Sequence, residues 1–382
     1  MKETVTTKGA QATKFVTSLG QSLLSLSFNL GGMLAGTLLA LYFNVFSLAP
    51  WALVIYPGIL SMRGVIGGLF SGRLSTGLHV GSVRAGFTGN TRNFYLLWRA
   101  IIVLTLESSI MLGLVASLFG VFLWGTTVIE CMAILGVVTA TMAISLVFLS
   151  PITVAISVLS FKHGLDPDII TYPIESTVAD IIITACYILV LNIFFLHPKP
   201  IGYPLIGLLN IVLLGLVVYF SFKNARENEF SKTIRESFLT LASVAFIVNI
   251  TGSFLTKIIK VIGVRPEVYT VYPALIDTMG DVGSIVGSTA TTKLAVGDIQ
   301  PSFSSIKQHK AEIGGAWTAS ALLFTSYSVI SSSIWGLATL NSLAALIARL
   351  LATNVLAIPI MVVIAYLVAI ATYRRGWDPD NF

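Results

Sequence analysis

Apolar runs of about 20 residues recur along almost the whole of this chain of 382 residues. A helix needs about 20 apolar residues to cross roughly 30 Å of hydrocarbon. Hydrophobic residues make up 55% of the chain and charged residues only 10%, whereas about a quarter of an ordinary soluble domain is charged. No long polar stretch separates the runs into a soluble domain. The sequence therefore predicts an all-α, polytopic membrane protein.

Ten membrane crossings are expected. They cover residues 20–46, 50–70, 94–124, 129–160, 169–196, 201–221, 235–260, 269–290, 313–338 and 341–373. The N-terminal residues lack the apolar core and cleavage site of a secretory signal, which indicates a cytoplasmic lead-in. With that orientation the predicted outer segments hold only four basic residues, Lys199, Lys257, Lys260 and Arg265. This asymmetry follows the positive-inside rule and predicts a multi-pass protein of the cell membrane.

A Gly-rich apolar stretch occurs twice in the chain. The segment YPGILSMRGVIGGLFSGRLSTGLHVGS begins at Tyr56, and YPALIDTMGDVGSIVGSTATTKLAVGD begins at Tyr272 and aligns with it without a gap. Two further pairs support the duplication: QSLLSL at 21–26 with ESFLTL at 236–241, and GLDPDII at 164–170 with GWDPDNF at 376–382. The chain is therefore predicted to contain two copies of one membrane unit.

The repeats define the expected domains. A lead-in at 1–19 precedes the first five-helix unit at 20–196, a connecting helix and cytoplasmic linker occupy 197–234, and the second unit covers 235–382. Six crossings before the second unit give both units the same orientation, related by a pseudo-two-fold along the membrane normal. Because the GLDPDII motif opens the fifth helix of the first unit, we expect the second unit's fifth helix after Phe382, and eleven crossings in a full-length chain.

Ionisable groups inside the membrane are candidates for function, because a charge at mid-membrane costs about 2.5 to 3.5 kcal/mol or more. Five acids lie within the predicted spans: Glu107, Glu175, Asp180, Asp277 and Asp281. Asp277 and Asp281 are four residues apart and share one helix face, and Gly280 between them allows close backbone approach. Oxygen ligands alone suit hard cations such as Mg²⁺, Ca²⁺ and Mn²⁺. The alternative is that one Asp accepts hydrogen bonds and supports packing.

The fifth predicted helix of the first unit carries Glu175 and Asp180 as further candidate ligands. They are about 140° apart on an ideal helix, and a kink at Pro173 could bring them together. Glu175 could instead neutralise an arginine. Asp166 and Asp168, which precede this helix, fit a helix cap followed by proline, with a cation-gathering role as the alternative.

The first copy has lost the acids of the second. Where the second copy has Asp277 and Asp281, the first has Ser61 and Val65, and Arg63 stands in place of Met279. An arginine in a cation pathway repels the ion, so we expect Arg63 to face away and to pair with an acid such as Glu107. The alternative is an arginine that competes with the ion for Asp180 during transport.

Two motifs resemble the membrane domain of MgtE-type magnesium transporters. One is the Pro57 motif P-x6-G-x-x-G followed by RLST, and the other is DPD-x4-P-x-x-[ST]-[ST]-x-x-D ending at Asp180. The duplication is similar to the solute carrier 41 relatives, in which two such units are fused. The resemblance implies passage of Mg²⁺ or another divalent cation along a pore between the units, lined by their second and fifth helices. It also implies ion contacts at Asp180 and at Asp277, Gly280 and Asp281.

We therefore expect a transporter or channel that works as a monomeric pseudo-dimer in the lipid bilayer, with no enzyme activity, no nucleic-acid partner and no cofactor besides the transported ion. A Na⁺- or H⁺-coupled carrier of a small organic solute is the alternative. An intramembrane aspartyl protease would need two facing carboxylates that share a proton. The segment Met279-Gly280-Asp281 lacks the first glycine of such a motif.

Overall fold

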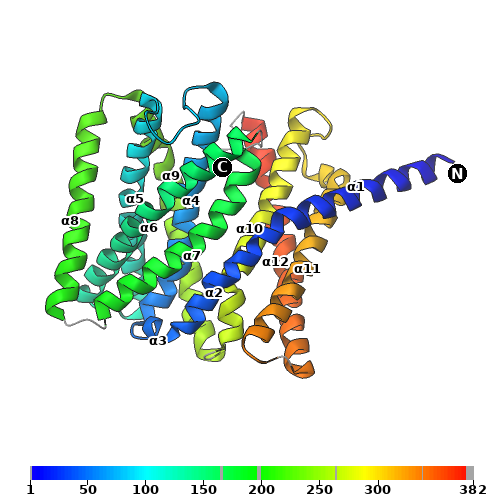
Figure 1. Ribbon diagram of the computed structural model, residues 1–382. Coiled ribbons are helices and arrows are strands. Elements are labelled where there is room, and N and C mark those ends of the chain that lie inside the picture. The colour runs from blue at the N-terminus through cyan, green and yellow to red at the C-terminus, as the bar shows by residue number, and fades with distance from the viewer. Residues whose placement is uncertain (1, 164–166, 196–198, 263–264, 338, 376–382) are drawn as a thin grey trace. The chain divides into compact units, whose positions relative to one another are not determined.

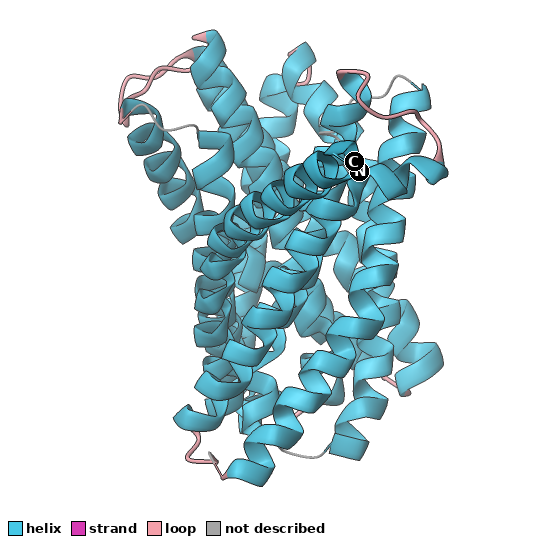
Figure 2. Ribbon diagram, turned by 90° about the vertical axis from the view of Figure 1, so that its right-hand side faces the viewer, coloured by secondary structure: helices cyan, strands magenta, loops and turns pink. Residues whose placement is uncertain are grey.

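The structure is a computed structural model that describes residues 2–163, 167–195, 199–262, 265–337 and 339–375. Every regular element in this part of the chain is helical (Figures 1 and 2). In order these are α1 (Lys2–Ser27), η1 (Phe28–Gly31), α2 (Gly32–Leu41), α3 (Phe43–Phe46), α4 (Pro50–Val80), α5 (Arg92–Phe119), η2 (Gly120–Trp124), α6 (Val128–Lys162), α7 (Pro167–Phe195), α8 (Lys199–Asn224), α9 (Asn228–Ile262), α10 (Pro266–Ala295), η3 (Phe303–His309), α11 (Lys310–Ile334) and α12 (Leu340–Arg375).

Nine helical segments among the described residues are long and apolar enough to cross a membrane. They correspond to nine of the ten predicted crossings, and the all-α, polytopic fold class is thereby confirmed. The remaining predicted crossing, 269–290, is helix α10. Its 30 residues reach about 45 Å, but Asp277 and Asp281 lower its hydropathy.

Local sequence signals set several helix ends. Helix α4 begins with Pro50, whose fixed φ suits a first helical turn, and ends before Gly81, which has φ 77 and so closes the helix in a left-handed conformation. The Thr91 side chain caps α5. Thr127 and Glu130 form a reciprocal capping box at the start of α6. Turn chemistry therefore sets these helix termini, and α4 continues to Val80, past the end of the predicted crossing at 50–70.

The chain divides into two compact units that do not follow the sequence repeats. The first, called here the α4 unit, contains residues 38–265, and the second, called the α10 unit, contains residues 1–37 and 266–382. In the α4 unit, α9 packs against α4 and α5. In the α10 unit, α1 packs against α11, and η1 packs against α10 (Figure 1). Each compact unit thus combines the opening helix of one repeat with later helices of the other.

Glycines show that the opening helices pack in the same way in both units. A Cβ on Gly36 would collide with the backbone oxygen of Thr270, and a Cβ on Gly252 would collide with that of Val54. These are matching positions, since Gly36 and Gly252 are separated by the same interval as Tyr56 and Tyr272, and so are Val54 and Thr270. Only glycine permits this approach.

A second reciprocal contact lies one turn away. A Cβ on Gly32 would lie 3.1 Å from the backbone nitrogen of Ala274, and a Cβ on Gly58 would lie 3.2 Å from Cγ2 of Val248. Gly32 corresponds to Val248 in the repeat, and Gly58 corresponds to Ala274. The duplication read from the sequence therefore reappears as the same helix packing inside each unit.

Candidate functional site

Asp277, Gly280 and Asp281 lie on one face of α10, as their spacing predicts. Asp277 and Asp281 are close enough to interact electrostatically. Gly280 is exposed, and a Cβ added there would meet no atom within 4 Å. The backbone around Gly280 is therefore open between two carboxylates, and oxygen ligands for a hard cation are available on this face.

The Asp281 carboxylate is held by an amide from the opening helix of the chain. Asn29 Nδ2 donates a hydrogen bond to Asp281 Oδ2 at 2.8 Å and lies 3.3 Å from Thr278 Oγ1. The Thr278 hydroxyl in turn lies 2.7 Å from the Tyr327 hydroxyl of α11. Asn29 is only 1% exposed. A buried chain of hydrogen bonds thus fixes one oxygen of Asp281 and leaves the carboxylate charge in place.

Asn29 was not among the predicted site residues. This residue belongs to η1, a 3₁₀ turn that separates α1 from α2 and turns the amide toward α10. A signal was present, because Asn29 is a lone amide in an apolar run and is followed by Gly31 and Gly32. A polar side chain within a membrane span needs a partner, but the sequence does not say which helix supplies it.

In the α4 unit, α7 places Glu175 and Asp180 in the interior, where they are 3% and 6% exposed. The helix is continuous from Pro167 to Phe195, so Asp180 lies about 1.4 turns beyond Glu175. Thr184 Oγ1 donates to the backbone oxygen of Asp180 at 2.6 Å. The side chains of Asp168 and Pro173, together with Asp166, lie outside the described residues.

The Glu175 carboxylate packs against the backbone of α4. Thr153 Oγ1 donates to Glu175 Oε1 at 2.7 Å. A Cβ on Gly67 would lie only 2.7 Å from the same oxygen, so any larger residue at this position would push the carboxylate away. The sequence repeat identified Gly67 as a shared glycine but gave no indication that an acid lies against it.

The structure favours Glu175 over Glu107 as the acid beside Arg63, in line with the alternative that Glu175 neutralises an arginine. Arg63 is 1% exposed, and the acid that acts on it electrostatically is Glu175. Glu107 is half-buried on α5, and no ion pair joins it to Arg63 in the described part of the chain. The packing of α7 against α4 brings Glu175, rather than Glu107, close to the guanidinium.

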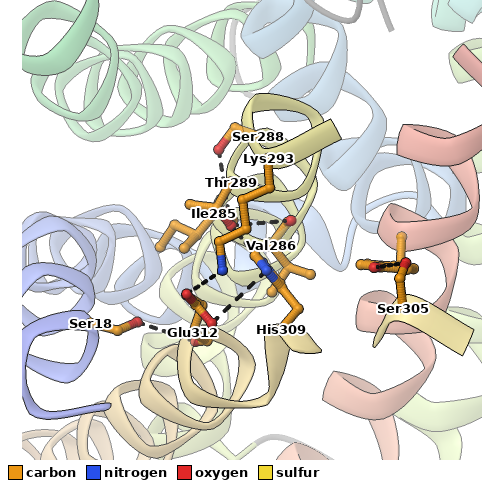
Figure 3. Close-up of polar contacts among 10 residues, drawn as sticks. Ser18, Ile285, Val286, Ser288, Thr289, Lys293, Ser305, His309 and Glu312 are labelled. Carbon is orange, nitrogen blue, oxygen red and sulfur yellow. Dashed lines mark hydrogen bonds and ion pairs between the residues drawn. The ribbon is translucent and has the colours of Figure 1, made fainter. Parts of the chain in front are cut away.

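A second polar cluster ties the end of α10 to the start of α11. Figure 3 shows Lys293 of α10 directed at Glu312 of α11, with which it forms an ion pair. His309 is fully buried, and its Nε2 lies 2.9 Å from Thr289 Oγ1. Ser18 Oγ of α1 donates to the Glu312 backbone oxygen at 3.3 Å. These contacts hold three helices of the α10 unit together at one end.

The α4 unit contains a cavity of about 420 Å³ near the C-terminal end of α4. Its polar lining comes from Arg73, Thr76, Ser82, Asn93 and Thr233. Arg73 lies ten residues beyond Arg63, or about 15 Å along the helix. Neither Glu175 nor Asp180 is among the residues that line this cavity.

Comparison with protein families gives a match in two segments, residues 56–190 and 272–382, to MgtE, described as a divalent cation transporter. These segments make up more than half of the chain. The chain belongs to the MgtE family. The matched segments begin at Tyr56 and Tyr272, the two residues at which the internal repeat begins. Comparisons with curated proteins and with solved structures find no match.

Membership of the MgtE family makes divalent cations the substrates and the bilayer the environment of this chain, and the family consists of transporters. Among the described residues, no three acidic, histidine or cysteine side chains gather at one point. The densest acidic arrangement that the sequence predicted, Asp277 with Asp281, is a pair. Mg²⁺ commonly binds through one or two carboxylates and keeps several of its waters, so a pair suits it.

Proposed function

We propose that this MgtE-family chain moves Mg²⁺ across the cell membrane along a path lined by the second and fifth helices of the repeats, which are α4, α10 and α7. Asp180, Asp277 and Asp281 would attract the ion, and the Gly280 backbone would contribute an oxygen. The N-terminus would be cytoplasmic, as the distribution of Lys and Arg indicates. One chain would supply both repeats and so act as a monomeric pseudo-dimer.

The observation that carries this proposal is the open face of α10 between two neighbouring carboxylates. Mg²⁺ sheds its water reluctantly, so carboxylates that orient its water shell attract it without stripping it. Asn29 supports this role, because its amide fixes the Asp281 carboxylate without neutralising it. Asp180, which is buried in the fifth helix of the first repeat, would add a third acid.

The test is Mg²⁺ uptake into proteoliposomes that contain the purified chain. Asp277→Asn with Asp281→Asn should reduce uptake at least tenfold, because the site loses both negative charges while keeping its shape. Asp298→Asn removes an exposed acid just beyond α10 and is the matched control, with unchanged uptake. Mg²⁺ uptake retained by the double variant would remove the pair from the mechanism.

The same vesicles distinguish a channel from a coupled carrier. Uptake that is unchanged by imposed Na⁺ or pH gradients would indicate a channel, whereas uptake that follows one of the gradients would indicate coupling. Mn²⁺ and Ca²⁺ in place of Mg²⁺ would measure selectivity among hard cations.

A further inference from the structure

The first repeat carries a buried cation where the second has a neutral residue. Arg63 of α4 corresponds to Met279 of α10. Its side chain is 1% exposed, and its Nε, Nη1 and Nη2 atoms have no hydrogen-bond partner among the described residues. A buried charge without hydrogen bonds is strongly unfavourable unless an opposite charge lies near.

Glu175 supplies that opposite charge. It is 3% exposed, and its Oε2 atom also has no hydrogen-bond partner in the described part of the chain. Gly67 leaves room for the carboxylate against α4, and Gly67 lies four residues after Arg63, so the two share a helix face. The guanidinium and the carboxylate attract each other without forming a direct ion pair.

The net charges near the two second helices therefore differ, because Arg63 and Glu175 offset each other at α4, whereas α10 carries two carboxylates. Helix α10 has Asp277 and Asp281 around Met279, whereas α4 has Ser61 and Val65 around Arg63. Residues 61 and 65 face away from the Arg63 side, but they lie only two residues from it, and charges interact strongly over such distances where water is scarce. An incoming divalent cation is attracted by the carboxylates of α10, whereas at α4 the guanidinium of Arg63 already offsets the Glu175 carboxylate.

We propose that Arg63 is a resident counter-cation for Glu175 that prevents a second divalent-ion site from forming on α4, so that each chain holds one ion, at α10. This inference rests on the proposed function. Glu175 then serves to neutralise Arg63 rather than to bind the transported ion. The chain's two similar helix arrangements would thus have one ion site between them.

Binding stoichiometry of Mn²⁺, measured by equilibrium dialysis on the purified full chain, tests this. The unmodified chain should bind one ion with the affinity of the site, and Asp277→Asn with Asp281→Asn should abolish it. Two grafts copy the second repeat into the first. Ser61→Asp with Val65→Asp keeps Arg63 and should still bind one ion, whereas the same pair with Arg63→Met should bind two.

Each result is decisive. Equal stoichiometry in the two grafts, whether one ion or two, would overturn the role of Arg63, and two ions in the unmodified chain would overturn the single site. If the Asp277→Asn, Asp281→Asn variant still binds Mn²⁺ as the unmodified chain does, that result would instead count against the proposed function. Thermal unfolding in detergent shows which grafts are folded. The Arg63→Met variant alone controls for the loss of the guanidinium, and it should still bind one ion.

Discussion

The α4 unit and the α10 unit use the same helix packing but different charges. In both, a glycine of an opening helix presses against a backbone oxygen of a second helix: Gly252 against Val54, and Gly36 against Thr270. On that shared framework, α4 carries a buried arginine and α10 carries two aspartates. The same backbone packing is therefore present in both copies, while the charged side chains on their second helices differ.

The opening helices differ in one respect that matters for the site. The stretch from Gln21 to Gly36 in the first repeat is one residue shorter than the matching stretch from Glu236 to Gly252 in the second repeat. The shorter copy contains the 3₁₀ turn η1, and such a turn rises about 2.0 Å per residue rather than about 1.5 Å. The turn makes up for the missing residue and also presents Asn29 to Asp281. The continuous helix α9 has no such turn.

The largest expected effect comes from breaking the shared packing. Gly36→Ala and Gly252→Ala should each destabilise the chain by about 1 to 3 kcal/mol or more, because the added Cβ overlaps a backbone oxygen that has no flexible end to move. Thermal unfolding in detergent would measure this. Gly64→Ala is the control, since a Cβ there would meet nothing within 4 Å. If Gly36→Ala and Gly252→Ala destabilise the chain by clearly different amounts, the helix packing in the two units is not equivalent.

The next largest effect concerns Asn29, whose amide donates a hydrogen bond to Asp281 of the acid pair in the α10 unit. Asn29→Leu should weaken Mn²⁺ binding about tenfold, because a hydrogen bond to a charged group contributes about 1.5 to 3 kcal/mol. Asn249→Leu is the matched control: its amide donates to the Ala245 backbone oxygen of its own helix α9. Equal loss of affinity in both variants would contradict a specific role for Asn29.

The smallest effects should come from the ion pairs at the matching ends of the second helices. Lys293 and Glu312 are 22% and 17% exposed, whereas Arg73 and Glu236 are 31% and 47% exposed. Exposed ion pairs contribute about 0 to 1 kcal/mol, so Arg73→Met should lower the free energy of unfolding by less than about 1 kcal/mol. Lys293→Met should lower it more than Arg73→Met does, because the Lys293–Glu312 pair is less exposed. Thermal unfolding at low and high salt would rank them, and the reverse order would contradict this reading.

Much of the fold followed from the sequence because the bilayer fixes helix length and composition. The runs at 129–160 and 341–373 correspond closely to α6 and α12. The sequence did not predict that each compact unit contains the opening helix of the other repeat. Helices α1 and α9 have similar apolar patterns, and hydrophobic periodicity does not indicate which helix another helix packs against. The choice of Glu175 over Glu107 as the acid beside Arg63 depends in the same way on how α7 packs against α4.

The candidate site was predicted in part. The spacing of Asp277 and Asp281 was enough to place them on one face, because helix geometry is local. The contact of Asn29 with Asp281 joins residues far apart in the chain, and the position of Glu175 against Gly67 depends on a tertiary approach. Such contacts are set by packing between helices, about which a single sequence says little.

The reciprocal exchange of α1 and α9 has a consequence for how such a chain could arise. A progenitor with a single repeat could not cover its own second helix with its own opening helix, and it would have needed another copy of itself to complete each compact body. Gene fusion would then have converted an obligatory association between two molecules into an internal one. Once joined, two halves need not carry the same charges, and in this chain one carries Arg63 while the other carries Asp277 and Asp281.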